Sequence, residues 1–258
     1  MPGKGPDKRE AARQRIAAQR AAEAAARAKA QRRRRTVLGG VGAAVVVVIA
    51  LVVVFVVQSS RTSTSASAAV PANTTDGGYA FGVGSADAEV TLDMYEDFQC
   101  PNCENLESTS GAAIQQLVSA GTVKVRYHGM AFLDTSKNDQ YSTRSLNAAA
   151  VVASTAGADA YAQFHQLLFA HQPPEGGSGL SDDQLIAYAN QAGATGATVA
   201  RDIRDLTYGD WTERATDQAS KDGVTGTPTV LVDGKPLPNA TTATPAQITA
   251  AVQAAAAG

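Results

Sequence analysis

An uncharged apolar run from Thr36 to Val57 constrains this chain more than any other feature. It is 22 residues long, and a helix rising about 1.5 Å per residue would span about 33 Å, enough to cross a hydrocarbon core of about 30 Å. It lacks the amphipathic period of a core helix and exceeds the apolar region of a signal peptide, about 7 to 15 residues. We therefore expect one transmembrane helix over residues 36–57. The Ala66-Ser67-Ala68 triplet leaves cleavage and release open as an alternative.

Charge is distributed unevenly on the two sides of this run. Residues 1–35 hold twelve Lys/Arg and three Asp/Glu, whereas the other 223 residues hold ten Lys/Arg and twenty-one Asp/Glu. Basic residues beside a membrane span stay on the cytoplasmic side. This pattern predicts a single-pass protein of the cell membrane, with a cytoplasmic basic arm over residues 1–35 and everything after residue 57 outside the cytoplasm. A topology signal that touches anionic lipid explains the arm, so we predict no nucleic-acid partner.

The region beyond the membrane divides into a linker and one domain. Residues 58–78 are small and polar, which favours a flexible Ser/Thr/Ala linker. Residues 79–258 are enough for one core. Their patterns predict a β-α-β unit, then a helical insertion over about 141–222, then β-β-α. The expected strands are 90–95, 123–128, 228–232 and 235–237, and the expected helices are 101–120, 142–155, 158–172, 181–192, 197–221 and one opening at Thr244.

The two cysteines lie where the first strand gives way to a helix, in Cys100-Pro101-Asn102-Cys103. The unpaired N–H groups at a helix N-terminus favour a thiolate over a thiol. Cys100 is therefore the candidate nucleophile, and Cys103, one turn later, the resolving thiol. Pro101 suits the first helical turn because it has no N–H to leave unpaired.

Other uses of the cysteines fit the sequence less well. A metal site needs more ligands, but there are no further cysteines, and His128, His165 and His171 lack zinc-finger spacing. We therefore predict no metal and no cofactor, and we assign His165 and His171 to packing or surface roles. A purely structural disulfide would close a very short loop and stabilise the fold little.

Taken together, these motifs resemble a known family. Asp97-Phe98-Gln99-Cys100-Pro101-Asn102-Cys103 and Gly226-Thr227-Pro228-Thr229-Val230, about 125 residues apart with helices between them, look like a DsbA-like thiol–disulfide oxidoreductase of the membrane-tethered type common in actinobacteria. The resemblance implies an α/β thioredoxin fold with an inserted helical subdomain. It also implies a cis Thr227–Pro228 bond beside the cysteines, where Thr227 and Pro228 would bind substrate backbone.

Two positions depart from the family pattern. Many thioredoxin-fold proteins have a buried carboxylate six residues before the first cysteine, where it moves the proton of the resolving thiol. Here that position is Met94, and Asp93, Glu96 or Asp97 are the candidate substitutes. The strongly oxidising relatives have His where this chain has Asn102, so the resemblance implies a less extreme reduction potential.

The resulting prediction is a membrane-anchored oxidoreductase that introduces disulfides into exported proteins through Cys100 and Cys103. The partners that the resemblance implies are exported proteins with thiols or disulfides and a membrane enzyme that reoxidises the cysteines, of the vitamin K epoxide reductase-like or DsbB-like type. The alternatives are a disulfide reductase or isomerase, and a tethered binding module with a structural disulfide. The direction of exchange, the reduction potential, the substrates and the oligomeric state are not determined by the sequence.

Overall fold

The computed structural model describes residues 68–257. The basic arm and the predicted membrane helix over residues 36–57 lie outside these residues. Among the helices within 68–257, none is both long and apolar enough to cross a membrane.

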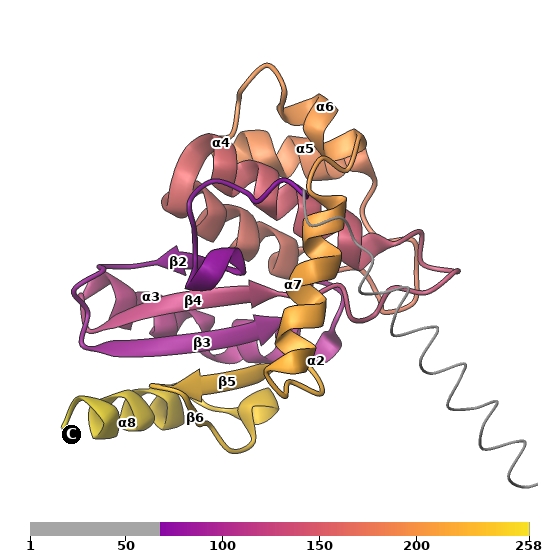
Figure 1. Ribbon diagram of the computed structural model, residues 1–258. Coiled ribbons are helices and arrows are strands. Elements are labelled where there is room, and N and C mark those ends of the chain that lie inside the picture. Colours follow the sequence, from indigo (N-terminus) through magenta and orange to yellow (C-terminus); the bar gives the residue numbers. More distant parts are fainter. Residues whose placement is uncertain (1–67, 258) are drawn as a thin grey trace, which may run out of the picture. The chain divides into compact units, whose positions relative to one another are not determined.

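A mixed sheet forms the centre of the domain (Figure 1). Its strand order is β1-β2-β4-β3-β5-β6, and only β3 and β4 are parallel. The helix between these two strands makes the crossover that a parallel pair requires. The strands are β1 (Thr74–Thr75), β2 (Ala80–Val83), β3 (Val90–Glu96), β4 (Val123–Gly129), β5 (Thr229–Val232) and β6 (Lys235–Pro236).

The crossover between β3 and β4 is one helical segment with a change of hydrogen-bond pattern inside it. It begins as α2 (Pro101–Leu106), passes through the π-helical turn η2 (Glu107–Gly111) and ends as α3 (Ala112–Ser119). A π-helical turn holds one residue more than the α-helix needs, and such turns are frequent at functional sites.

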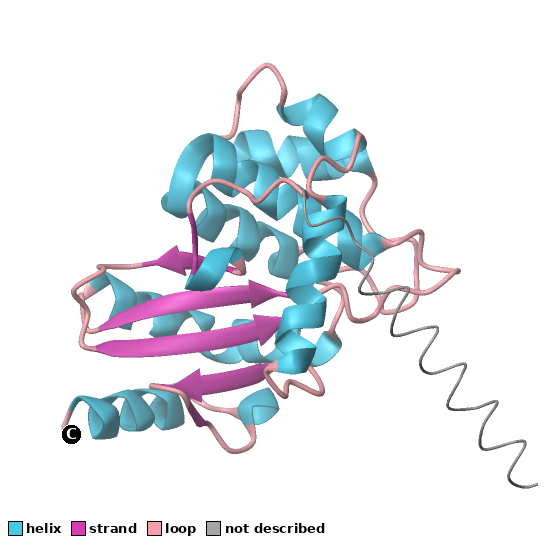
Figure 2. Ribbon diagram, in the orientation of Figure 1, coloured by secondary structure: helices cyan, strands magenta, loops and turns pink. Residues whose placement is uncertain are grey.

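Four helices fill the insertion between β4 and β5, and Figure 2 shows α4, α5 and α6 gathered on the β2 side of the sheet. The longest, α4, has a break at Gly157, whose φ of 85° favours glycine. The helix α8 begins after Thr244 as predicted, with a capping box in which the Thr244 side chain accepts a hydrogen bond from the Gln247 backbone N–H. The helices are α4 (Tyr141–Ala170), α5 (Asp182–Gln191), α6 (Val199–Arg204), α7 (Gly209–Lys221) and α8 (Pro245–Ala256), with 3-10 turns η1 (Asp76–Gly78) and η3 (Ala240–Thr242).

From residue 90 onward the structure confirms the predicted order β-α-β, helices, β-β-α. It corrects the start of the domain and the helix expected over residues 197–221, which is two helices, α6 and α7. The sequence predicted a flexible linker as far as Gly78. Residues 68–78 instead contact the domain, through β1 and through a hydrogen bond of 2.8 Å from Trp211 Nε1 to the Gly78 carbonyl oxygen. The strands β1 and β2 were not predicted: β1 has two residues, and Gly82 interrupts the apolar pattern of β2. The domain therefore starts earlier in the chain than composition suggested.

Candidate active site

Cys100 caps the helix that begins at Pro101, at the carboxyl end of β3. Its extended backbone (φ −80°, ψ 117°) turns the chain from strand to helix, and Pro101 takes the first helical position as predicted. The Cys100 carbonyl accepts the N–H of Cys103 at 3.0 Å. Asn102 lies exposed on the outer side of this turn. Both cysteines are free thiols.

The two thiols have opposite electrostatic surroundings. The pKa of Cys100 is lowered to about 6, because hydrogen bonds to its sulfur outweigh burial. The largest is from the Cys103 thiol, and the others are from the Thr227 side chain and from the backbone N–H groups of Cys103 and Asn102. Burial raises the pKa of Cys103 far above its ordinary value, and the charge of Glu96 adds to this effect. Cys103 is 0% exposed, whereas Cys100 is 6% exposed. Cys100 is therefore the thiolate at the mouth of the site, and Cys103 the thiol beneath it.

The loop that contains Thr227 and Pro228 lies against the cysteines. The Thr227–Pro228 peptide bond is cis, as the resemblance implies. The Thr227 carbonyl oxygen lies 3.3 Å from Cys100 Sγ, within reach of a hydrogen bond from the sulfur when it is protonated. Pro228 is buried and Thr227 half-buried. The structure thus brings together all six residues that the sequence marked: Cys100, Pro101, Asn102, Cys103, Thr227 and Pro228.

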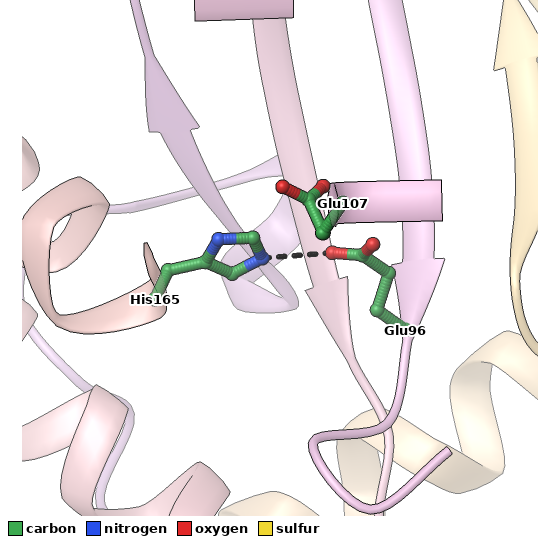
Figure 3. Close-up of side chains that lie close together, drawn as sticks. All are labelled: Glu96, Glu107 and His165. Carbon is green, nitrogen blue, oxygen red and sulfur yellow. Dashed lines mark hydrogen bonds and ion pairs between the residues drawn. The ribbon is translucent and has the colours of Figure 1, made fainter. Parts of the chain in front are cut away.

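Figure 3 shows a cluster of Glu96, Glu107 and His165, in which Glu96 and His165 are buried and Glu107 is half-buried. Glu96 ends β3, Glu107 opens the π-helical turn, and His165 projects from α4. His165 Nε2 is 2.8 Å from Glu96 Oε2. Burial raises the pKa of both carboxyl groups to about 8 and lowers the pKa of His165.

Among the residues that the structure describes, this cluster is the group whose side chains could hold a metal ion, because its candidate ligand atoms lie within 4.8 Å of one another. With both carboxyl pKa values near 8 and that of His165 lowered, the cluster is uncharged at neutral pH. A cation would have to displace two protons to bind there. The cluster therefore favours protons over a cation, and the absence of a metal stays a prediction.

Sequence reasoning named Glu96 only as one of three substitutes for the missing carboxylate, and it missed the other two members of the cluster. Glu107 follows Cys103 by four residues, so both lie on one face of the helix, a signal that was present in the spacing. His165 was assigned to packing. It does pack against aromatic rings: its ring centroid is 4.4 Å from that of Tyr127 and 4.9 Å from that of Phe169. It also contacts Glu96. Met94, at the family's position, is a fully buried core residue.

The other two acids near the site hold structure in place. Asp97 accepts hydrogen bonds from the backbone N–H groups of Gln99, Phe132 and Leu133 and from the hydroxyl of Ser142. These bonds join the strand end to the loop after β4 and to the start of α4. Asp93 lies on the other side of β3, bonded to Arg126 and His128. Of the three proposed substitutes, Glu96 is the one whose charge acts on Cys103.

Comparisons with known proteins identify the family of the chain. The family model described as Thioredoxin matches residues 76–254. The reduced disulfide oxidoreductase DsbG of Mycobacterium tuberculosis is 31% identical, with a TM-score of 0.60 over 70% of this chain and 93% of that one. Reduced DsbA from the same organism is 30% identical, with a TM-score of 0.59 over 69% of this chain and 98% of that one.

Two further matches define the extent of the likeness. MdbA, a thiol-disulfide oxidoreductase from Corynebacterium diphtheriae, is 25% identical, with a TM-score of 0.57 over 69% of this chain and 89% of that one. The serine/threonine-protein kinase PknE of M. tuberculosis is 34% identical over 116 residues, 43% of this chain, but the match spans only 20% of the kinase. The chain belongs to the thioredoxin family, as a DsbA-like thiol–disulfide oxidoreductase.

Proposed function

We propose that this chain introduces disulfides into exported proteins, with Cys100 and Cys103 as its catalytic pair. The observation that carries the proposal is the opposite shift of the two thiol pKa values. With a pKa of about 6, Cys100 is mostly thiolate at neutral pH in the reduced protein. A stabilised thiolate favours the reduced form, which makes the disulfide form a better oxidant.

The reaction is an exchange of one disulfide for another. A substrate thiolate attacks Cys100 Sγ in the Cys100–Cys103 disulfide, and the electron pair of the broken bond goes to Cys103 Sγ. A second substrate thiolate then attacks the substrate sulfur of the mixed disulfide, and Cys100 leaves as a thiolate. The substrate loses two electrons and gains its disulfide, while the protein is left reduced.

Substrate backbone would bind at the Thr227 loop. The Thr227 carbonyl lies 3.3 Å from Cys100 Sγ, so a segment whose cysteine reaches Cys100 passes directly beside this main chain. Hydrogen bonds to an extended backbone require little of the substrate's sequence. A broad range of substrates follows from that mode of binding.

The proposed location is the outer side of the cell membrane, with residues 36–57 as the anchor. The support is the 22-residue uncharged run and the basic residues before it. A membrane enzyme of the vitamin K epoxide reductase-like or DsbB-like type would then reoxidise Cys100 and Cys103. A reporter that is active only outside the cytoplasm, fused after Gly258, should be active. Activity of a cytoplasm-only reporter at the same place would refute this location.

Trapping of mixed disulfides tests the catalytic pair. Cys103→Ala removes the resolving thiol, so mixed disulfides with exported proteins should accumulate on Cys100 and disappear when a reductant is added. Cys100→Ala should trap almost none, because Cys103 is fully buried. The two variants are matched controls for each other, since both lose the same disulfide. Equal lanes without trapped partners on a non-reducing gel would refute the assignment.

The direction of exchange can be tested separately. The purified protein is equilibrated with glutathione buffers, and its thiols are trapped and counted. A reduction potential nearer to about −120 mV than to about −270 mV supports oxidation of substrates. A potential near the lower value would make the chain a reductase while leaving its cysteine pair catalytic.

A further inference from the structure

One aromatic side chain is exposed at the end of the sheet that carries the active site. Among the residues that the structure describes, Phe132 and Val70 are the large hydrophobic side chains that are exposed, at 47% and 52%. Val70 lies in the segment before β1, whereas Phe132 lies in the loop that follows β4. A single exposed apolar side chain needs no functional explanation by itself. The position of Phe132, and the way its backbone is held, supply one.

The loop after β4 lies at the same edge of the sheet as the catalytic pair. The strands β3 and β4 are parallel and end in register, and β5 starts beside the end of β3. Figure 1 shows the three strands meeting at the edge beside α7. Cys100 follows β3, Phe132 follows β4 and Thr227 precedes β5. The three residues therefore belong to three neighbouring strand ends, with Cys100 in the middle.

The carboxylate of Asp97 ties the backbone of Phe132 to that of the nucleophile. Asp97 Oδ2 accepts the N–H groups of Phe132 and Leu133, at 2.8 and 2.9 Å. Its Oδ1 accepts the N–H of Gln99 at 2.9 Å. Gln99 directly precedes Cys100, and the Cys100 N–H donates to the Asp97 carbonyl oxygen at 2.9 Å. One fully buried side chain thus fixes where the exposed ring starts relative to the reactive sulfur.

The residues just before Phe132 are anchored to α7 and to the chain that follows it. The Ala131 N–H accepts no strand partner but donates to the Thr216 hydroxyl of α7 at 2.9 Å. Met130 packs in a small buried cluster with Val224, which lies between α7 and the loop with the cis bond. The backbone of Phe132 is therefore held on both sides while its ring is exposed. A contact with a ring on such a fixed backbone costs little ordering entropy.

An extended substrate that lies along this edge would pass over the ring. Neighbouring strands lie about 4.8 Å apart, and an extended chain advances about 3.3 Å per residue. A segment that runs from the Thr227 loop across Cys100 therefore reaches the line of β4 one or two residues beyond its own cysteine. The side chain that follows there is close enough to contact Phe132.

We propose that Phe132 binds an apolar side chain of the substrate, about two residues from the reacting cysteine, and thereby gives the enzyme a preference for unfolded chains. This inference rests on the proposed function, because it names the class of segment that the catalytic pair oxidises. Backbone binding at the Thr227 loop remains tolerant of sequence, and the preference comes from the side chain beside it.

The chemistry of unfinished proteins favours such an occupant. Cysteine is among the residue types most often buried in folded proteins, so cysteines that will pair lie among future core side chains. These apolar side chains are exposed before the chain folds. Covering Phe132 with one of them removes apolar surface of both partners from water, which is favourable. The folded product buries the same side chain in its own core, so the contact is lost when the product leaves.

The test is a double-mutant cycle between the protein and a synthetic substrate. The oxidised protein is mixed with a reduced peptide that has two cysteines, each with Leu two residues before and after it, or with a counterpart that has Ser at those places. Peptide disulfide is measured by acid quench and mass spectrometry as a second-order rate constant. Phe132→Ser should lower this constant roughly tenfold for the Leu peptide and less than about twofold for the Ser peptide.

Two further variants separate the contact from effects on folding. Phe132→Leu keeps an apolar side chain and should retain most of the rate with the Leu peptide. Val70→Ser makes a similar change at the other exposed hydrophobic side chain, away from the active-site edge, and should leave both rates unchanged. Urea unfolding and the pH dependence of Cys100 alkylation should be the same in all the variants, which establishes that the site is intact.

Three results would overturn the proposal. Equal losses for the two peptides in Phe132→Ser would mean that the ring supports the site rather than a substrate side chain. Unchanged rates with both peptides would show that no substrate contacts it. Unchanged peptide rates together with slower reoxidation by cell membranes would assign the ring to the reoxidising enzyme. Failure of the proposed function looks different, because the unchanged oxidised protein would then leave both peptides reduced.

Discussion

The strand β3 carries two buried carboxylates that bond to histidines, and their protonation behaves in opposite ways. Asp93 contacts His128 Nε2 at 2.9 Å, and Glu96 contacts His165 Nε2 at 2.8 Å. Burial alone would raise the pKa of Asp93, but hydrogen bonds from His128 and Arg126 outweigh it and hold the pKa below its usual range. Burial raises the pKa of Glu96 to about 8.

The difference lies in what faces each side of the strand. Residues three apart point to opposite faces of a strand. On the Asp93 side, the Arg126 guanidinium bonds to both Asp93 and Asp76, and it is one-third exposed. On the Glu96 side, the neighbours are a second acid and a histidine whose pKa is lowered. The Arg126 guanidinium thus helps to keep Asp93 ionised, whereas no such cation bonds to Glu96 among the residues that the structure describes.

The largest effect we expect is on stability at pH 7. Asp93→Asn leaves Arg126 and His128 without their anion and should lower the free energy of unfolding by about 2–3 kcal/mol. Glu96→Gln replaces an acid that the fold holds protonated with a neutral amide, so it should not lower the free energy of unfolding. Urea unfolding midpoints measure both. Equal losses would mean that both carboxylates are charged, and the contrast between the two sides would fail.

The second effect appears at alkaline pH. An acid whose pKa is raised by folding binds its proton in the folded state at pH values where the unfolded chain has lost it. Stability therefore falls as pH rises from about 4.5 to about 8. At pH 8.5, Glu96→Gln should be more stable than the unchanged protein, by roughly 1.4 kcal/mol for each unit by which folding raises the pKa of Glu96. Parallel stability curves for the two proteins would contradict the raised pKa.

The smallest effect comes from removing the cation on the Asp93 side. The lowered pKa of Asp93 stabilises the fold above about pH 4, and this stability is lost as pH falls through the folded-state pKa. Arg126→Gln should raise that pKa and shift the acid limb of unfolding to higher pH. It should cost about 1 kcal/mol at pH 7, because solvent screens the exposed part of the guanidinium. An unmoved acid limb would assign the lowered pKa to His128 alone.

Sequence reasoning reached much of the site because its chemistry depends on local patterns. Cys100 and Cys103 share one helical turn, and the cis Thr227–Pro228 bond lies in the motif from which the resemblance implied it. The cluster beneath depends on contacts between residues 69 apart in the chain, Glu96 and His165, which periodicity does not reveal. A glutamate in phase with Leu92 and Met94, the core face of β3, was the available signal. Strand β2 was missed because Gly82 interrupts its apolar pattern, whereas the equally short β5 reads Thr-Val-Leu-Val.

The π-helical turn at Glu107–Gly111 also affects the direction in which the side chains of its helix point. Because such a turn contains one surplus residue, deleting a single residue from it would restore an ordinary α-helix. That repair would rotate everything before the turn by about 100° relative to everything after it. Cys103 and Glu107 would then point elsewhere while α3 kept its contacts. A chain with the shorter, more regular helix would still have its thioredoxin sheet, but its thiols would have lost their orientation.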